Sequence, residues 1–261
     1  FIDRNTDYPW NLLTPNLARL VRMGGFRRLD TEVRQFLHDP RTIRSLSFQA
    51  MYAGVSPFSA LAIYGIISYM DSVAGVSVPR GGMHEIPVAM AGAAAKHGVE
   101  LRYGTEVARI ERSGRRATAV ITAAGERIPA DVVVVNADLP VAHRDLLDHN
   151  PWTLRRLRYS PSAFVMLAGS DRDYPAAAHH NIHFGAAWRR TFAELIDDKK
   201  LMSDPSLMVT HLSRDDPSLA PAGRHAYYVL FPTPNATADI DWSRETARYT
   251  DEVLRVLEAR G

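Results

Sequence analysis

The chain has 261 residues, enough for one large domain or two modest ones with a sizeable buried core. A hydrophobic content of 46% against 23% charged residues excludes wholesale disorder, and the net charge of +2 indicates no particular class of partner. The absence of cysteine excludes disulfides, thiolate nucleophiles and cysteine-based zinc sites.

Helices are predicted for the first 75 residues. Thr14 and Pro15 are typical of an N-cap and a first helical position. Two further short helices are predicted to begin at Asp30 and Pro40. A fourth, Ser56–Ala74, has apolar side chains on every side, so we expect it to be buried or to line an apolar cavity.

The pattern changes between residues 76 and 140. Gly81 and Gly82 precede an alanine-rich helix, Met83–His97, and short strands follow it. The strands are predicted at Val99–Tyr103, Val107–Arg112, Ala117–Thr122 and Arg127–Ile128. The run Asp131–Asn136, with four consecutive valines, is typical of a parallel strand covered on both faces.

Residues 141–261 favour an antiparallel sheet with flanking helices, a second domain type. The strands are predicted at Ala163–Ala168, Ile182–Phe184, Leu207–Leu212 and Ala226–Phe231. The longest apolar stretch of the chain, Ala60–Met70, is too short to span a bilayer. The chain begins at Phe1 and ends directly after a helical pattern, Asp251–Arg260, so we interpret both ends as truncations.

Several catalytic motifs do not occur in the sequence. It has no Gly-x-Ser-x-Gly, which disfavours a serine hydrolase, and no glycine-rich motif that would cradle a phosphate. His179, His180 and His183 are the first candidates for metal ligands. Their stretch is predicted as a loop followed by a strand, with no glutamate between them, so we predict no metal site.

Arginine is concentrated at the N-terminus, with eight residues against five acids in the first 45. They are Arg4, Arg19, Arg22, Arg27, Arg28, Arg34, Arg41 and Arg44. Two interpretations stay open, a solvated basic face and attachment to anionic lipid headgroups. Nucleic-acid binding is disfavoured because no basic stripe is interleaved with aromatic residues.

A group of apolar residues is rich in methionine and tyrosine. Its members are Phe48, Met51, Tyr52, Phe58, Tyr64, Tyr69 and Met70. Periodicity leaves open whether they form plain core or line a cavity for a long apolar ligand.

Six segments in order resemble the bacterial phytoene desaturase (carotenoid desaturase) family of FAD-dependent oxidoreductases. They are Phe48–Pro87, Val99–Glu111, Asp131–Leu147, Ala178–Gly185, Ser218–Asn235 and Ile240–Trp242. The resemblance covers nearly the whole chain and identifies it as an internal fragment. The N-terminal Gly-x-Gly-x-x-Gly segment and the C-terminal segment, which both contact the flavin in this family, are not in the sequence.

The resemblance implies an α/β (mixed α+β) chain with a monoamine-oxidase-like two-domain flavoprotein fold, here incomplete. It would hold part of the FAD-binding domain and most of the substrate domain. We expect residues 1–75 to be a helical, membrane-associating part of the substrate domain. Residues 76–140 would be a returning segment of the FAD-binding domain, and residues 141–261 the substrate domain with its antiparallel sheet and flanking helices.

The resemblance also implies site residues. FAD is the expected cofactor, with the backbone around Val107 against its adenine and with Gly81 and Gly82 packed near it. The residues expected to line a substrate tunnel are Phe48, Met51, Tyr52, Tyr64 and Tyr69. The candidate walls of this tunnel are the apolar helix Ser56–Ala74 and the strands of residues 160–232.

The catalytic residue is left unassigned. Some relatives have an acidic residue, proposed for acid–base work, at the position that we align with Asn11, and an amide cannot act as a base. Asp3 or Asp7 could substitute for it.

The implied activity is the FAD-dependent desaturation of phytoene to more conjugated carotenes, for which the protein supplies positioning and a dry tunnel. The alternatives are a desaturase of another carotenoid (diapophytoene or a later-step intermediate) and a non-catalytic module that binds an apolar ligand. The expected partners are a long apolar isoprenoid and, peripherally, the membrane, but no nucleic acid; a homo-oligomer is left open. We expect a cytoplasmic protein at the inner face of the cell membrane, and no activity from the fragment alone.

Overall fold

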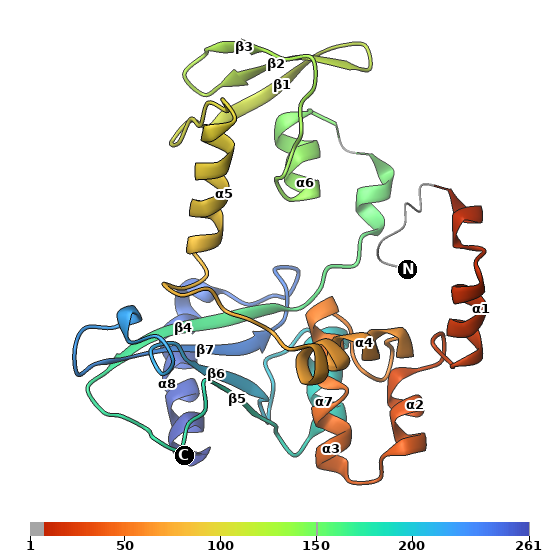
Figure 1. The fold of residues 1–261 in the computed structure, drawn as a ribbon, viewed down its shortest axis with the longest axis vertical. Helices are drawn as coiled ribbons and strands as arrows, with labels where there is room; N and C mark the ends of the chain where they lie inside the picture. The colour runs from red at the N-terminus through yellow and green to blue at the C-terminus, as the bar shows by residue number, and fades with distance from the viewer. Residues whose placement is uncertain (1–7, 150, 261) are drawn as a thin grey trace. The chain divides into compact units, whose positions relative to one another are not determined.

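The structure is a computed structural model that describes residues 8–149 and 151–260. It divides into two compact units, both drawn in Figure 1. The first unit combines residues 1–83 with residues 159–261, and the second consists of residues 84–158. The second unit is therefore an insertion in the first, and most of the predicted segment 76–140 belongs to it. The three-segment division itself stays a prediction.

Short helices make up the N-terminal part of the first unit. They are the 3-10 helix Pro9–Leu12, α1 (Pro15–Arg22), α2 (Leu29–Phe36), α3 (Pro40–Ser45) and the 3-10 helix Phe48–Ala53. The predicted start of α1 is confirmed, because the Thr14 hydroxyl oxygen accepts a hydrogen bond from the Leu17 N–H at 3.2 Å. Asp39 caps α3 in the same way, by accepting from the Arg41 N–H at 2.8 Å.

The helix predicted over Ser56–Ala74 is confirmed only from Ala62 onward, and its helical form changes along the segment. The structure has a 3-10 turn at Ala62–Tyr64, α4 at Gly65–Tyr69 and one π-helical turn at Met70–Ala74. Residues before Ala62 cannot be helical because their backbone pairs with residues 27–30. The Leu29 N–H donates to the Ala60 carbonyl at 2.9 Å, and the Ala62 N–H donates to the Arg27 carbonyl at 2.8 Å.

Several apolar side chains of this segment are exposed, whereas we predicted that the segment is buried or lines an apolar cavity. Ile66 is 49% exposed and Tyr69 is 55% exposed. The main contacts of this segment with other elements are those with α2 and with the 3-10 helix Phe48–Ala53.

A four-stranded antiparallel sheet forms the rest of the first unit, with the strand order β4-β7-β6-β5. Its strands are β4 (Ser162–Ser170), β5 (His180–His183), β6 (Leu207–His211) and β7 (His225–Thr233). The predicted strands of this part are confirmed, with small shifts of their ends. Because neighbouring strands run in opposite directions, the ends of β4 and β6 meet the beginnings of β7 and β5 at one edge.

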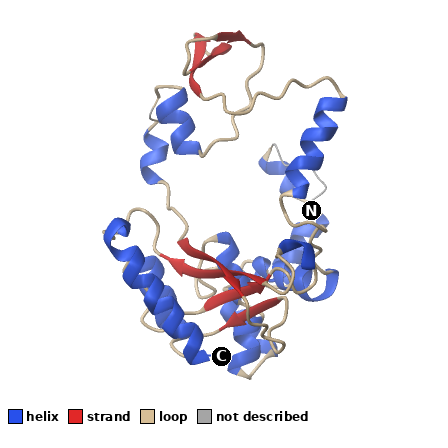
Figure 2. Ribbon diagram, turned by 90° about the vertical axis from the view of Figure 1, so that its left-hand side faces the viewer, coloured by secondary structure: helices blue, strands red, loops and turns tan. Residues whose placement is uncertain are grey.

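One face of this sheet is covered by α8 (Trp242–Arg260), as Figure 2 shows. The buried residues between them are Leu207, Val229, Phe231, Tyr249 and Val253. Tyr249 and Val253 are four residues apart and therefore share a face of α8. A shorter helix, α7 (Trp188–Phe192), continues into a π-helical turn, Ala193–Asp197. None of the helices that the structure describes is both long and apolar enough to span a membrane.

The second unit contains a helix and a small antiparallel sheet of order β1-β2-β3. Its elements are α5 (Glu85–Lys96), β1 (Val107–Ser113), β2 (Arg116–Thr122), β3 (Arg127–Pro129), α6 (Leu139–Val141), the π-helical turn Ala142–Leu146 and the 3-10 helix Trp152–Arg156. The predicted helix 83–97 and the three predicted strands from 107 to 128 are thereby confirmed.

Two predicted strands of this unit are wrong: Val99–Tyr103 and Asp131–Asn136 are not paired with any described strand. Val132 is 78% exposed and Val134 is 89% exposed, so the valine run is not covered either. A strand forms only where another strand satisfies its backbone groups. Among the described residues, neither segment pairs with the outer edge of β1 or of β3, the two edge strands of this sheet.

Candidate functional site

An apolar cavity of about 330 Å³ lies in the first unit, against the face of the four-stranded sheet opposite to α8. Phe48, Met51 and Tyr52 line it together. They belong to the 3-10 helix Phe48–Ala53, in which residues three apart lie on the same side, so Phe48 and Met51 both reach the cavity. These three residues are among those predicted for a substrate tunnel, and that role stays a prediction.

The sheet supplies the opposite wall of this cavity. Leu230 and Pro232 of β7 line it, and each faces a lining residue across the sheet. Ala163 of β4 lies opposite Pro232, and Met208 of β6 lies opposite Leu230. Alternate residues of a strand point to opposite faces, so the same strand buries Phe231 against α8 and presents its neighbours to the cavity.

Aromatic rings close one side of the cavity. The ring centroid of Phe48 lies 5.7 Å from that of Tyr52 and 5.6 Å from that of Phe184, both in edge-on geometry. Phe184 in turn contacts Trp188 edge-on at 5.3 Å. Such contacts stabilise by roughly 0.5–1.5 kcal/mol each beyond area burial. The wall is therefore held in place before any ligand enters.

The cavity continues into exposed apolar surface along β4. Val165 and Leu167 share the face of Ala163 and are 43% and 74% exposed. At the mouth, Tyr52 is 57% exposed. Partial burial, reinforced by the negative charge of Asp71, raises the pKa of the Tyr52 phenol, so the group is neutral at physiological pH. A long apolar molecule that enters the cavity would meet no charged side chain among its lining residues.

The other two predicted tunnel residues lie elsewhere in the first unit. Tyr64 packs against the buried cluster of Leu29, Ala50 and Ala60. Tyr69 is exposed and is not among the residues that line the cavity. The structure thus brings three of the five predicted residues together.

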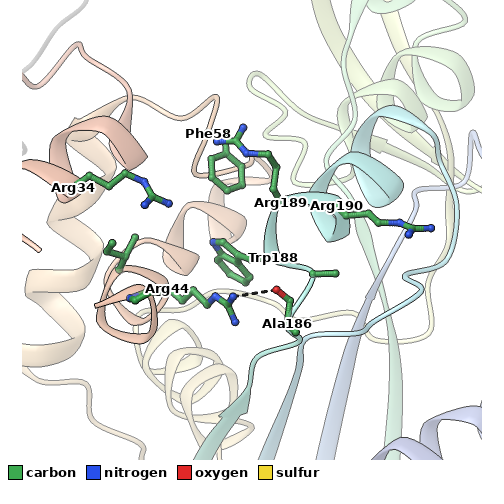
Figure 3. Close-up of a pocket in the computed structure, with 10 residues that line it drawn as sticks. Arg34, Arg44, Phe58, Ala186, Trp188, Arg189 and Arg190 are labelled. Atoms are coloured by element: carbon green, nitrogen blue, oxygen red, sulfur yellow. Dashed lines mark hydrogen bonds between the residues drawn. The ribbon is translucent and has the colours of Figure 1, made fainter. Parts of the chain in front are cut away.

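A second cavity, of about 340 Å³, is lined by arginines and is drawn in Figure 3. Arg44 donates hydrogen bonds to the carbonyls of Gly185 and Ala186 at 2.9 and 3.1 Å, and Figure 3 shows it beside Trp188. The guanidinium of Arg189 lies 3.8 Å from the centroid of the Phe58 ring.

The remaining two arginines of this second cavity are paired with acids. Arg34 contacts Asp30 at 2.8 Å, and Arg190 contacts Glu194 at 2.6 Å. Three of the four cationic groups are therefore already hydrogen-bonded to oxygen atoms of the protein. For this reason we place the candidate substrate site in the apolar cavity.

The predicted flavin contacts are distributed over both units. Gly81 and Gly82 have φ values of 86° and 93°, which only glycine adopts without strain. The Gly81 N–H donates to the Asp216 carboxylate at 2.6 Å, and a Cβ on Gly82 would lie 3.3 Å from a methyl carbon of Leu219. In the structure these glycines make a tight turn against that loop, and their contact with a cofactor stays a prediction.

Val107, the third predicted flavin contact, begins β1 in the second unit. The pairing of β1 with β2 is irregular between Val107 and Arg109. Such an irregularity leaves backbone groups outside the regular ladder and is common beside functional sites. This feature fits a backbone contact with a cofactor at Val107, and that contact stays a prediction.

The side chains of His179, His180 and His183 have different surroundings in the structure. His179 contacts Asp215 at 2.9 Å, while the Nδ1 atom of His180 lies 2.9 Å from the Thr210 hydroxyl. Burial lowers the pKa of His180 and of His183. Because His180 and His183 belong to a strand and are three residues apart, they point to opposite faces.

The position aligned with an acidic residue in relatives, Asn11, lies in the 3-10 helix Pro9–Leu12 and is partly buried. Its N–H donates to the Tyr8 carbonyl at 2.9 Å. The two proposed substitutes, Asp3 and Asp7, lie outside the described residues. The catalytic residue therefore remains unassigned.

The sheet wall of the cavity was expected only as a region, the strands of residues 160–232, and its individual residues were not named. Ala163, Met208 and Leu230 lie in predicted strands, whereas Pro232 directly follows the predicted strand Ala226–Phe231. Apolar residues at successive positions of β7 are the signal that could have found them, because such a strand must be covered on both faces.

Comparison with known proteins places the chain in a family. Residues 12–258 match the family described as flavin containing amine oxidoreductase. The chain is 53% identical to the phytoene dehydrogenase of Streptomyces griseus, over 100% of this chain and 52% of that protein. It is 39% identical to the zeta-carotene-forming phytoene desaturase of Myxococcus xanthus, over 88% of this chain and 45% of that protein.

More distant relatives agree with this placement. A 4,4'-diapophytoene desaturase of Methylomonas is 31% identical over 87% of this chain and 45% of its own length. The crystal structure of an oxidoreductase from Methanosarcina mazei shares the fold, with a TM-score of 0.61 at 18% identity, over 95% of this chain and 57% of the other. The chain spans about half the length of the curated relatives it matches. It belongs to the flavin containing amine oxidoreductase family.

Proposed function

We propose that this chain forms the substrate-holding part of an FAD-dependent carotenoid desaturase that acts on phytoene. The observation that carries the proposal is the apolar cavity between the sheet and the 3-10 helix Phe48–Ala53, which has no charged lining residue. The relatives named above are desaturases and dehydrogenases of long polyenes, which are substrates of matching chemistry.

The size of the cavity fits one segment of a long ligand rather than the whole molecule. Its 330 Å³ is at the low end of the roughly 300–1,000 Å³ that is usual for small-molecule sites. A segment of a long hydrocarbon fits such a volume, and the rest of the molecule would follow the exposed Val165 and Leu167 of β4. Burial of this apolar surface favours binding by about 25 cal/mol per Å².

The flavin, when bound, supplies the oxidation by accepting two electrons with hydrogen from a saturated carbon pair. Residues of this chain would bind the hydrocarbon, orient it and keep water away. We assign Phe48, Met51 and Tyr52 to this task, together with the sheet wall. Gly81, Gly82 and Val107 are the residues of this chain that we propose to lie near the cofactor.

Phytoene is preferred over diapophytoene as the substrate because the identity to the phytoene dehydrogenase is 53%, against 31% to the diapophytoene desaturase. The test is expression of the full-length protein in a bacterial host that accumulates phytoene, with pigment analysis by chromatography. Coloured carotenes are the expected product. A colourless extract from cells that contain folded, flavin-loaded protein would refute the proposed activity.

The cavity itself is tested by filling it. Ala163→Trp adds a large side chain to the cavity wall without removing a contact, and we expect it to lower carotene formation at least about tenfold while the flavin spectrum is retained. Ala259→Trp is the matched control, since Ala259 is exposed on α8. Equal carotene yields from both variants would refute the assignment of the cavity.

We further propose peripheral contact of α1 with an anionic membrane surface. No residue of α1 is buried, and its exposed residues include Val21 and, at the C-cap, Met23. Arg19 and Arg22 have no ion-pair partner within the part of the chain that the structure describes. Cations beside exposed apolar residues attach to anionic headgroups.

The other N-terminal arginines support this proposal less. Arg27, Arg34 and Arg41 are paired with acids at 3.0, 2.8 and 2.7 Å. Substituting Arg19 and Arg22 together by Gln should therefore abolish most of the sedimentation with anionic vesicles, whereas Arg41→Gln should not. Equal binding of all variants to anionic and neutral vesicles would refute the membrane contact.

A further inference from the structure

Two histidines and an aspartate meet at one edge of the four-stranded sheet. His211 is the last residue of β6, His225 is the first residue of β7, and Asp173 lies in the loop that follows β4. These three strands are neighbours of alternating direction, so the corresponding ends lie side by side. The ligand-type atoms of the three side chains are within 4.8 Å of one another.

His211 is the member of this group that most needs a partner. It is 2% exposed, yet neither of its ring nitrogens makes a hydrogen bond with any residue that the structure describes. Its ring stacks on Tyr227 with centroids 4.4 Å apart and lies 5.3 Å from the ring of His225. A buried imidazole with no hydrogen bond is unfavourable, and such groups in native proteins have a partner or a bound ion.

The other two members are not engaged either. The side chains of His225 and Asp173 make no hydrogen bond or ion pair with residues in the described ranges. The neighbouring His179 is different, since it already contacts Asp215 at 2.9 Å. The nearby cation, Arg214, is directed at the Pro175 carbonyl at 3.3 Å. The group is thus two imidazoles and one carboxylate without competing partners.

We propose that His211, His225 and Asp173 bind a divalent late first-row transition-metal ion, for which Zn²⁺ is the probe. Two imidazoles and a carboxylate are a donor set that such ions prefer. Donors around a tetrahedral zinc ion lie about 3.4 Å apart, given zinc–donor distances of about 2.0–2.1 Å. The side chains must therefore approach by roughly 1.4 Å at most, and Asp173, which is exposed in its loop, is free to rotate.

This site lies at the opposite end of the strands from the apolar cavity. β7 begins at His225 and reaches the cavity residue Pro232 near its other end. Seven residue steps of a strand cover roughly 23 Å at about 3.3 Å each. An ion held by His225 would therefore not touch a molecule in the cavity. Its effect would be structural, because it joins the ends of three strands.

The experiment is a calorimetric titration of the chelator-treated full-length protein with Zn²⁺, followed by thermal unfolding with and without the ion. We expect one saturable ion per chain and a higher melting temperature in its presence. His225→Gln should weaken Zn²⁺ binding at least about 100-fold, the upper end of the loss seen when an outer partner of a metal ligand is removed. Asp173→Asn, an isosteric change at an exposed position, should also weaken Zn²⁺ binding.

His179→Gln is the matched control, because this histidine lies at the same edge but is paired with Asp215. It should leave the Zn²⁺ affinity and the melting shift unchanged, and circular dichroism should show all variants folded. The proposal is overturned if the wild-type protein binds no Zn²⁺ saturably, or if His225→Gln and Asp173→Asn bind it like the wild type. Loss of binding in His179→Gln alone would also overturn it. Because the ion and the cavity are separate, none of these results depends on the desaturase activity.

Discussion

Replacing Tyr249 by phenylalanine should stabilise the protein. Tyr249 is 1% exposed in the core between α8 and the sheet, and its hydroxyl has no hydrogen-bond partner among the described residues. Burial, together with the charge of Glu252, raises the pKa of this phenol, so the group stays neutral at all relevant pH values. The hydroxyl therefore loses its hydration on folding and gains nothing in return.

The expected change in stability follows from the free-energy cost of burying a hydroxyl that makes no hydrogen bond, which is about 1–3 kcal/mol in protein mutational data. The ring itself keeps its edge-on contacts with Phe164 at 5.2 Å and with Phe231 at 6.3 Å in Tyr249→Phe. We expect the free energy of unfolding to rise by roughly 1 kcal/mol. For a unit of this size the melting temperature should rise by about 2–4 °C.

The assay is urea unfolding followed by circular dichroism, with Tyr103→Phe as the control. Tyr103 is 78% exposed, so loss of its hydroxyl should change the free energy of unfolding by less than about 0.5 kcal/mol. Destabilisation of Tyr249→Phe by 1 kcal/mol or more would refute the reasoning, since it would mean that the hydroxyl has a partner, such as a buried water molecule.

Two further substitutions test the local geometry of the first unit. Gly54→Ala should lower the free energy of unfolding by more than the backbone strain alone, which is about 1–3 kcal/mol. The reason is that φ is 71° and that the new Cβ would also lie 2.3 Å from the Cβ of Ser160. Gly223→Ala is the control in the same urea assay, because its φ is 70° but the space around it is open, so it should cost only the backbone strain. Glu194→Gln should cost roughly 1–3 kcal/mol at neutral pH, because the buried carboxylate accepts hydrogen bonds from the N–H and hydroxyl of Ser203, both at 2.8 Å. Burial alone would raise the pKa of Glu194, but the hydrogen bonds from Ser203 and from a neighbouring arginine outweigh it and hold the pKa below its ordinary value of 4.5. The stabilisation by this carboxylate is therefore complete above the unfolded-state pKa and is lost as the pH falls through the lower folded-state pKa. The free energies of unfolding of the wild type and of Glu194→Gln should therefore converge in acid. A difference between them that is the same at all pH values would contradict this.

The elements that sequence reasoning predicted well are those whose signals are local. Thr14 caps α1 by a bond to a residue three positions away, and the sheet strands are runs of apolar residues between turns. The family was predicted from the resemblance to carotenoid desaturases, and the match of residues 12–258 to the flavin containing amine oxidoreductase family agrees with it. None of these inferences needed knowledge of which segments lie side by side.

The failures share one cause, which is backbone pairing at long range. Residues near Ala60 look helical from their composition, but their carbonyls and N–H groups are taken by residues 27–30. The valine run Val132–Val135 looks like a buried strand, but it does not pair with any strand that the structure describes. Composition reports what a segment can bury, whereas pairing depends on what lies next to it.

Of the candidate sites, the sequence predicted the residues that are close together in the chain but not those that come together from different strands. Phe48, Met51 and Tyr52 were found because they are close in sequence and rich in aromatic and sulfur-containing side chains. The cluster of His211, His225 and Asp173 was not found, because the three residues come from different strands and no spacing rule groups them. The histidines that are adjacent in sequence were the ones that the structure keeps apart.

The strand β7 makes the core and the cavity interdependent. Val229 and Phe231 point toward α8, while Leu230 and Pro232 point toward the cavity. A shift of β7 by one residue would exchange these two sets, so the packing of α8 fixes which residues face the ligand. For this reason Tyr249→Phe, which keeps the ring and the register, should leave carotene formation unchanged. Truncation of Phe231 to alanine should impair it, although Phe231 does not line the cavity, because it loosens the packing that holds β7 in register.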